Sequence, residues 1–215
     1  MVKISASVLN ADLSALGEEV ARAKAAGAPW LHIDVMDGVF VPPMTIGDVV
    51  VSSLRERNKD MVFDSHLMVE QPERVITTFA EAGSDYISVH VESNCDVSNT
   101  VRKIKECGCR AGIAINPPTL IETVFDYLEI ADMFVVMSVN PGYGGQKFIP
   151  TSLDKIARLR EEANLRGVKP LIQVDGGINA ETAPLAIKAG ADILVVGSYL
   201  WNSPDMKSAI ELLQS

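Results

Sequence analysis

The chain has 215 residues, of which 47% are hydrophobic, and it carries a formal net charge of −9 at pH 7. This length suits one domain with a sizeable core, and no apolar run reaches the roughly 20 residues that a membrane-spanning helix needs. The acidic balance argues against nucleic acid or an anionic membrane as a partner. A negatively charged small molecule would therefore need a local source of positive potential.

Apolar runs that are typical of buried parallel strands alternate with helical periodicity along the whole chain. The predicted strands are Lys3–Leu9, Trp30–Asp34, Val62–Leu67, Tyr86–Val91, Arg110–Ile115, Met133–Ser138, Leu171–Asp175 and Ile193–Val196. The segments between them carry apolar stripes, namely Leu13, Leu16, Val20 and Ala23; Val75, Ile76, Phe79 and Ala80; Val97, Val101 and Ile104; and Leu153, Ile156 and Ala157.

Helix boundaries are indicated by capping residues. Thr119 with Glu122 predicts a capping box, and Ser203 followed by Pro204 predicts an N-cap with proline at the first helical position. Glycines that fit left-handed C-caps recur before predicted strands, at Gly27, Gly83, Gly108 and Gly190. This recurrence indicates a repeated strand–helix unit.

About eight such units in just over 200 residues predict a single-domain (β/α)8 TIM barrel over residues 1–215. The competing architecture is an open, doubly wound parallel sheet. The first strand–helix turn, Asn10-Ala11-Asp12, lacks the glycine-rich fingerprint of a dinucleotide-binding fold. The barrel is therefore preferred, with its active site at the carboxyl ends of the strands.

Histidines and acids gather at these strand ends. His32, Asp34 and Met36 share one face of the second strand, because alternate residues of a strand point to the same side. His32, Asp34, His66 and Asp175 form a set of two imidazoles and two carboxylates that suits one divalent transition metal: zinc, iron, manganese or cobalt.

A metal ion that lies between two acids from distant strands predicts a reaction in which a proton is removed from the carbon next to a carbonyl. The metal would polarise the carbonyl and stabilise an enediolate, while Asp34 and Asp175 exchange protons on opposite faces and so invert the carbon. Met36, Met68 and Met137 are candidates for apolar walls around the planar intermediate, although ordinary core packing explains them equally well.

Glycine-rich loops follow the last three predicted strands. They contain Gly142, Tyr143, Gly144 and Gly145; Gly176 and Gly177; and Gly197 and Ser198. Glycine lets backbone N–H groups approach an anion closely, and many barrels build a phosphate site from the loops after the last two strands and a short extra helix. We therefore expect a phosphate site here, with residues 198–201 supplying that helix.

Several motifs together resemble the ribulose-phosphate 3-epimerase family along nearly the whole chain. They are Leu31-His32-Ile33-Asp34-Val35-Met36-Asp37-Gly38, His66-Leu67-Met68-Val69, His90-Val91-Glu92, Asn116-Pro117, Met137-Ser138-Val139-Asn140-Pro141-Gly142-Tyr143-Gly144-Gly145-Gln146, Val174-Asp175-Gly176-Gly177-Ile178 and Gly197-Ser198. The resemblance implies a metal-dependent TIM barrel that interconverts D-ribulose 5-phosphate and D-xylulose 5-phosphate.

The resemblance also implies residue roles. His32, Asp34, His66 and Asp175 would bind the metal, with Asp34 as proton acceptor and Asp175 as proton donor. Ser7 and His66 would touch the sugar, and the three glycine loops would hold the phosphate. Departures from the family pattern at Ala6, Asn10, Pro43, Ser65 and Val196, and in the run Tyr199-Leu200-Trp201, leave open a six-carbon substrate such as D-allulose 6-phosphate.

Two other function classes stay open. One is a sugar-phosphate-binding barrel without turnover, against which the intact Asp34 and Asp175 speak. The other is an aldol-type lyase, but no lysine lies in the carboxyl-terminal half of any predicted strand. The start of the chain lacks a signal-peptide layout, and Cys95, Cys107 and Cys109 suit reduced thiols. We expect a cytoplasmic homo-oligomer that acts on a small sugar phosphate.

Overall fold

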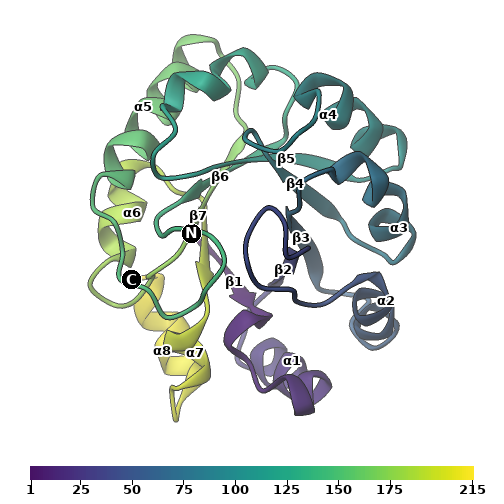
Figure 1. The fold of residues 1–215 in the computed structure, drawn as a ribbon. Helices are drawn as coiled ribbons and strands as arrows, with labels where there is room; N and C mark the ends of the chain where they lie inside the picture. Colours follow the sequence, from purple (N-terminus) through teal and green to yellow (C-terminus); the bar gives the residue numbers. More distant parts are fainter.

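A computed structural model describes all 215 residues as a closed barrel of eight parallel strands in the order β1 to β8, seen down its axis in Figure 1. The prediction of a (β/α)8 barrel is confirmed. The strands are β1 (Lys3–Ser7), β2 (Trp30–Met36), β3 (Val62–Met68), β4 (Tyr86–His90), β5 (Arg110–Ile115), β6 (Met133–Met137), β7 (Leu171–Asp175) and β8 (Ile193–Val196).

Helices surround the barrel. The α-helices are α1 (Leu16–Ala25), α2 (Asp48–Arg57), α3 (Ile76–Glu81), α4 (Val97–Glu106), α5 (Ser152–Leu165), α6 (Ala183–Ala189), α7 (Ser198–Trp201) and α8 (Met206–Leu213). Short 3-10 helices are η1 (Val8–Asn10), η2 (Leu13–Ala15), η3 (Pro72–Arg74) and η4 (Ile121–Tyr127). No helix is both long and apolar enough to cross a membrane.

All eight predicted strands are present, and β5, β7 and β8 have the predicted bounds. The first strand stops at Ser7 rather than Leu9, because the Ser7 hydroxyl accepts from Leu9 N and caps the η1 turn. β2 runs two residues further than predicted and β3 one further, whereas β4 and β6 stop one residue earlier.

Two predicted helix caps are wrong. The segment after Thr119 is the 3-10 helix η4. Its N-cap residue is Leu120, and no side chain caps it. α8 is capped by Asp205, whose carboxylate accepts from Ser208 N, rather than by Ser203. By contrast, the four glycines at helix ends have φ values of +85° to +116°, as predicted for left-handed C-caps.

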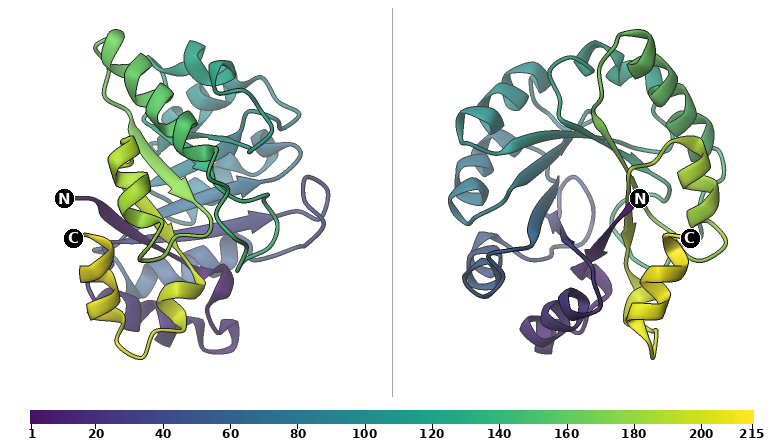
Figure 2. Two further views of the ribbon diagram at one scale, coloured as in Figure 1. Left: turned by 90° about the vertical axis from the view of Figure 1, so that its left-hand side faces the viewer. Right: turned by 180° about the vertical axis from the view of Figure 1, so that it is seen from behind.

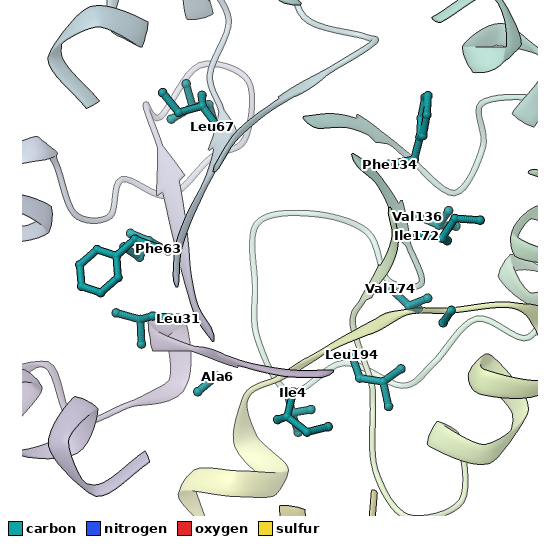
Figure 3. Close-up of a cluster of buried hydrophobic side chains, with 14 of the residues drawn as sticks. Ile4, Ala6, Leu31, Phe63, Leu67, Phe134, Val136, Ile172, Val174 and Leu194 are labelled. Carbon is teal, nitrogen blue, oxygen red and sulfur yellow. The ribbon is translucent and has the colours of Figure 1, made fainter. Parts of the chain in front are cut away.

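The main core lies between the barrel and the helices and is made by alternate strand residues. Ile4, Leu31, Phe63, Phe134 and Leu194 belong to this cluster of 50 buried residues, and Figure 3 shows their side chains pointing outward from the ring of strands. Of the predicted helix stripes, only Leu13 and Ala157 neither belong to this cluster nor pack against it. Leu13 is 53% exposed, and Ala157 is exposed as well.

The inward-facing residues divide the barrel interior along its axis. A separate apolar cluster begins with Trp30, Tyr86, Met133 and Ile193 near the start of their strands and continues along β6 to Met137. Buried polar residues of β1, β2, β3, β4 and β7 also face the interior, most of them further along the strands: Ser5, Ser7, His32, Asp34, Asp64, His66, Ser88, His90 and Gln173. Figure 2 shows both chain termini at the opposite end of the barrel from the long loops after β2 and β6. The polar interior therefore opens toward those loops.

Candidate active site

Four side chains from three strands converge inside the barrel at the carboxyl ends of the strands. His32 and Asp34 lie on β2, His66 on β3 and Asp175 at the end of β7. One ligand atom from each lies within 4.8 Å of every other. In the β2–β3 register Asp34 pairs with His66, so neighbouring strands bring these two side chains to the same level.

The spacing of the four donor atoms fits one metal ion. His32 Nε2, His66 Nδ1 and Asp34 Oδ1 are mutually 3.3 Å apart. Asp175 Oδ2 is 3.6 Å from His32 Nε2 and 3.7 Å from His66 Nδ1. Tetrahedral ligands about 2.0–2.1 Å from a zinc ion stand about 3.3–3.4 Å apart. Imidazole and carboxylate donors suit zinc, iron, manganese and cobalt alike.

His32 is held from behind by a buried acid. Its Nδ1 lies 2.8 Å from Asp64 Oδ2, which also accepts a hydrogen bond of 2.8 Å from Gln173 Nε2. Burial would lower the pKa of His32, but the nearby Asp34 and Asp64 carboxylates raise it well above its ordinary value. Where a metal displaces the proton on Nε2, the carboxylate at Nδ1 would keep the other proton in place and direct the Nε2 lone pair at the ion.

A second histidine stands behind His66. His90 Nε2 lies 2.8 Å from His66 Nε2, and the rings stack with centroids 4.9 Å apart. On its other side, His90 Nδ1 lies 3.1 Å from Glu92 Oε2. Burial lowers the pKa of His90 to about 4, so this ring is neutral near pH 7.

The two oxygens of Asp34 have different surroundings. Oδ1 faces the donor cluster, while Oδ2 accepts a hydrogen bond of 2.8 Å from the Ser7 hydroxyl. Burial would raise the pKa of Asp34, but His32 and then His66 hold it well below its ordinary value. Asp34 is therefore ionised, with its second oxygen on the side of the pocket.

A pocket opens above the cluster. It is lined by all three predicted methionines, by Asp34 and Asp175, and by every predicted substrate-binding residue except His66: Ser7, Gly142, Tyr143, Gly144, Gly145, Gly176, Gly177, Gly197 and Ser198. His32 and His66 are fully buried below its floor. Tyr143 lies at the rim, with 61% of its surface exposed.

The glycine loops approach one another closely at one end of this pocket. Gly177 has φ +63°, and a Cβ atom there would lie 2.4 Å from Phe148 N. A Cβ on Gly144 would lie 2.2 Å from Asn10 Oδ1, and one on Gly197 would lie 2.8 Å from the same atom. Glycine is therefore required at Gly177, where φ is positive and the close atom belongs to the backbone, whereas at Gly144 and Gly197 the absence of a side chain makes room for Asn10.

Sequence reasoning missed several participants. Asn10 lines the pocket between two glycine loops, although its sequence signals are only a turn position and a departure from the family pattern. Asp64 lies two residues before His66 in the predicted third strand, but alternation alone gives it no role, and Gln173 carried no signal within an apolar strand. Only the pairing across the barrel interior, from β7 to β3, shows what Gln173 does.

Comparison with known proteins gives consistent matches. Residues 3–201 match the model of the Ribulose-phosphate 3 epimerase family. The chain is 46% identical over 211 residues to the ribulose-phosphate 3-epimerase of Bacillus subtilis, covering 98% of this chain and 97% of the relative. It is 43% identical over 210 residues to the chloroplastic ribulose-5-phosphate-3-epimerase of Arabidopsis thaliana, covering 97% and 74%.

Among solved structures, 3-keto-L-gulonate-6-phosphate decarboxylase from Vibrio cholerae superposes with a TM-score of 0.73 at 14% identity. The match covers 100% of this chain and 96% of that one. At so low an identity the likeness shows the fold alone.

Proposed function

The chain belongs to the ribulose-phosphate 3-epimerase family and is a carbohydrate epimerase, an isomerase; from this we propose that it interconverts D-ribulose 5-phosphate and D-xylulose 5-phosphate. We further propose that the reaction depends on one divalent metal and uses two bases. The observation that carries this proposal is the convergence of two carboxylates and two imidazoles beneath a single pocket.

The glycine end of the pocket is the proposed phosphate site. Backbone N–H groups of Gly144, Gly145, Gly177, Gly197 and Ser198 would bind the phosphate, helped by the position of Ser198 at the start of α7. Such a site uses backbone dipoles, so it suits a chain with a net charge of −9. The opposite end of the pocket, at Asp34 and Ser7, then receives the sugar carbons.

His32, Asp34, His66 and Asp175 are the proposed metal ligands, since their donor atoms have the spacing that one ion requires. When bound, a divalent ion supplies Lewis-acid stabilisation of the negative charge that develops next to the reacting carbon. Asp64 behind His32 would keep the Nε2 lone pair of that ligand directed at the ion.

The two carboxylates are the proposed proton carriers. Asp34, ionised and with Oδ2 on the pocket side, removes the proton from C3, and the electrons of that C–H bond pass into the C2 carbonyl to form an enediolate. Asp175 in its protonated form then delivers a proton to C3 from the opposite face, which inverts the carbon. Before the next turnover in the same direction, Asp34 loses its proton to water and Asp175 takes one from water. In the reverse direction the two acids exchange roles.

Three methionines line the pocket between the acids. Met36 and Met68 form a small buried cluster with Val41, and Met137 belongs to the apolar cluster inside the barrel. Their thioethers offer polarizable, uncharged surface to a planar intermediate and keep water from it. This packing would favour return of the proton over side reactions.

The experiment that tests the proposal compares two substrates. Purified protein, loaded with metal, is assayed with D-ribulose 5-phosphate and with D-allulose 6-phosphate side by side. We expect a higher kcat/KM for the five-carbon substrate. A preference for the six-carbon sugar would assign the departure at Asn10, which lines the pocket, to substrate choice. No turnover of either sugar would contradict the enzymatic function.

Location and assembly are further proposals. A cytoplasmic location is supported by the three cysteines, all of which are free thiols in the structure. Homo-oligomer formation stays a prediction, and sedimentation of the purified protein would check it.

A further inference from the structure

A buried chain of side chains runs from the proposed ligand His66 to His90 and Glu92, and the last two have no role in the reaction proposed above. It begins at the donor cluster, passes through His90, which is fully buried, and ends at Glu92, whose side chain is 22% exposed. Glu92 Oε1 accepts a hydrogen bond of 2.8 Å from Asn116 N, while Oε2 faces His90. The chain thus connects a proposed metal ligand to the protein backbone on the far side of β4.

Two neutral imidazoles carry two protons for three contacts, so one contact goes without a proton. We take this to be the longest, His66 Nδ1 to Asp34 Oδ1 at 3.3 Å, because the contacts from His66 to His90 and from His90 to Glu92 are 2.8 Å and 3.1 Å. An ionised carboxylate only accepts, so Glu92 requires a proton on His90 Nδ1. Neutral His90 then has a lone pair on Nε2, which can accept only from a proton on His66 Nε2, 2.8 Å away. His66 Nδ1 is left with a lone pair, and this atom lies 3.3 Å from both Asp34 Oδ1 and His32 Nε2.

We infer that Glu92, acting through His90, is a positioning residue that fixes the tautomer of His66 and so presents the Nδ1 lone pair to the metal site. His32 reaches the same end by a shorter route, because Asp64 binds its Nδ1 directly and leaves Nε2 for the site. The two ligands therefore use opposite ring nitrogens. His66 turns Nε2 away from the site. The Glu92 carboxylate acts on this atom through the ring of His90, which lies between them.

The substitution Glu92→Gln tests this inference because it can reverse the order of the protons on His90 and His66. The Asn116 N–H needs an acceptor, so the amide oxygen takes that place and the amide NH2 faces His90 Nδ1. His90 must then accept at Nδ1 and carry its proton on Nε2. That proton points at His66 Nε2 and moves the His66 proton to Nδ1, where it blocks the metal site.

Glu92→Ala separates the proton order from simple packing. It removes the acceptor without supplying a donor, so it leaves the His66 tautomer unfixed rather than reversed. Glu70→Gln is the matched control: Glu70 lies two residues beyond the end of β3, as Glu92 lies two beyond the end of β4, and only its backbone groups make hydrogen bonds.

The first measurement is the 15N spectrum of labelled histidine in the metal-free proteins. We expect His66 to carry its proton on Nε2 in the unmodified protein and in Glu70→Gln, and on Nδ1 in Glu92→Gln. A proton on His66 Nδ1 in the unmodified protein would overturn the inference. The spectrum reports the tautomer without reference to catalysis or to metal.

The second measurement is metal affinity, by competition with a chelator. Groups that orient metal ligands are typically worth about 10- to 100-fold in affinity, so we expect a loss of that size in Glu92→Gln, a smaller loss in Glu92→Ala and none in Glu70→Gln. A larger loss in Glu92→Ala than in Glu92→Gln would instead indicate packing and overturn the inference. The inference rests on the proposed function for the metal ligands; a metal-binding protein with these tautomers but without epimerase activity would contradict only the proposed function.

Discussion

Two serines on β1 offer a matched test of how Asp34 is held. Ser5 and Ser7 are both buried and lie two residues apart on the inward face of the strand. The Ser7 hydroxyl donates to Asp34 Oδ2 at 2.8 Å, whereas the Ser5 hydroxyl has no hydrogen-bond partner. Ser7→Ala and Ser5→Ala therefore remove the same atom from similar surroundings. Only Ser7→Ala also removes a hydrogen bond to Asp34, the proposed base.

The expected magnitude follows from that one bond. A hydrogen bond to a charged group contributes about 1.5–3 kcal/mol, and about 1.4 kcal/mol corresponds to a factor of ten. If the bond orients Asp34 in the transition state, Ser7→Ala should lower kcat/KM by about 10- to 150-fold. Ser5→Ala removes an unpaired hydroxyl, so activity should change less than about twofold and stability should be equal or slightly higher.

The assay is steady-state epimerisation of D-ribulose 5-phosphate by both variants, with urea unfolding to confirm that each is folded. Ser7→Ala should also lose about 1–2 kcal/mol of stability, because a buried carboxylate oxygen and Leu9 N lose a partner. Equal kcat/KM in the two variants would refute the assignment of Asp34 Oδ2 as the oxygen that works on the substrate.

Three further predictions concern the metal, the phosphate loops and the two acids. Exhaustive chelation should abolish activity and lower the Tm, and one equivalent of a divalent transition metal should restore both; full activity of a protein shown to be metal-free would contradict this. Gly177→Ala should raise KM by about tenfold or more, because φ is +63° and the new Cβ would lie 2.4 Å from Phe148 N. Gly108→Ala is the control, since φ there is +85° but no atom lies close. It should leave KM unchanged and cost about 1 kcal/mol of stability. Asp34→Asn and Asp175→Asn should each reduce kcat by more than about 1,000-fold, corresponding to roughly 4 kcal/mol; substantial turnover in either variant would favour a single-base mechanism.

The fold was predictable because the strand pattern is strong. The apolar runs at Leu171–Asp175 and Ile193–Val196 have the predicted bounds, since the outer faces of parallel strands covered by helices are apolar. The errors lie at helix starts. Asp205 outcompetes Ser203 as the cap of α8 because its carboxylate reaches Ser208 N, a contact that depends on local backbone geometry.

The placement of the site residues was predictable in part. Alternation along β2 predicts that His32, Asp34 and Met36 face the same side, and the structure has them so. The roles of Asp64 and Gln173 could not be predicted. Their hydrogen bond crosses the barrel interior and joins residues that are 109 positions apart in the sequence. The place of Asn10 in the pocket depends on where its own loop after β1 meets the loops after β6 and β8, and no local sequence pattern predicts that meeting.

The central claim is that Asp34 and Asp175 exchange protons at C3 from opposite faces, and incorporation of solvent hydrogen tests it most directly. The reaction is run from D-ribulose 5-phosphate in D2O, and deuterium at C3 of the first-formed D-xylulose 5-phosphate is measured by NMR. The account predicts that nearly every product molecule carries solvent deuterium at C3, because the proton delivered by the second acid never belonged to the substrate. Product that retains the hydrogen of the substrate at C3 would contradict it.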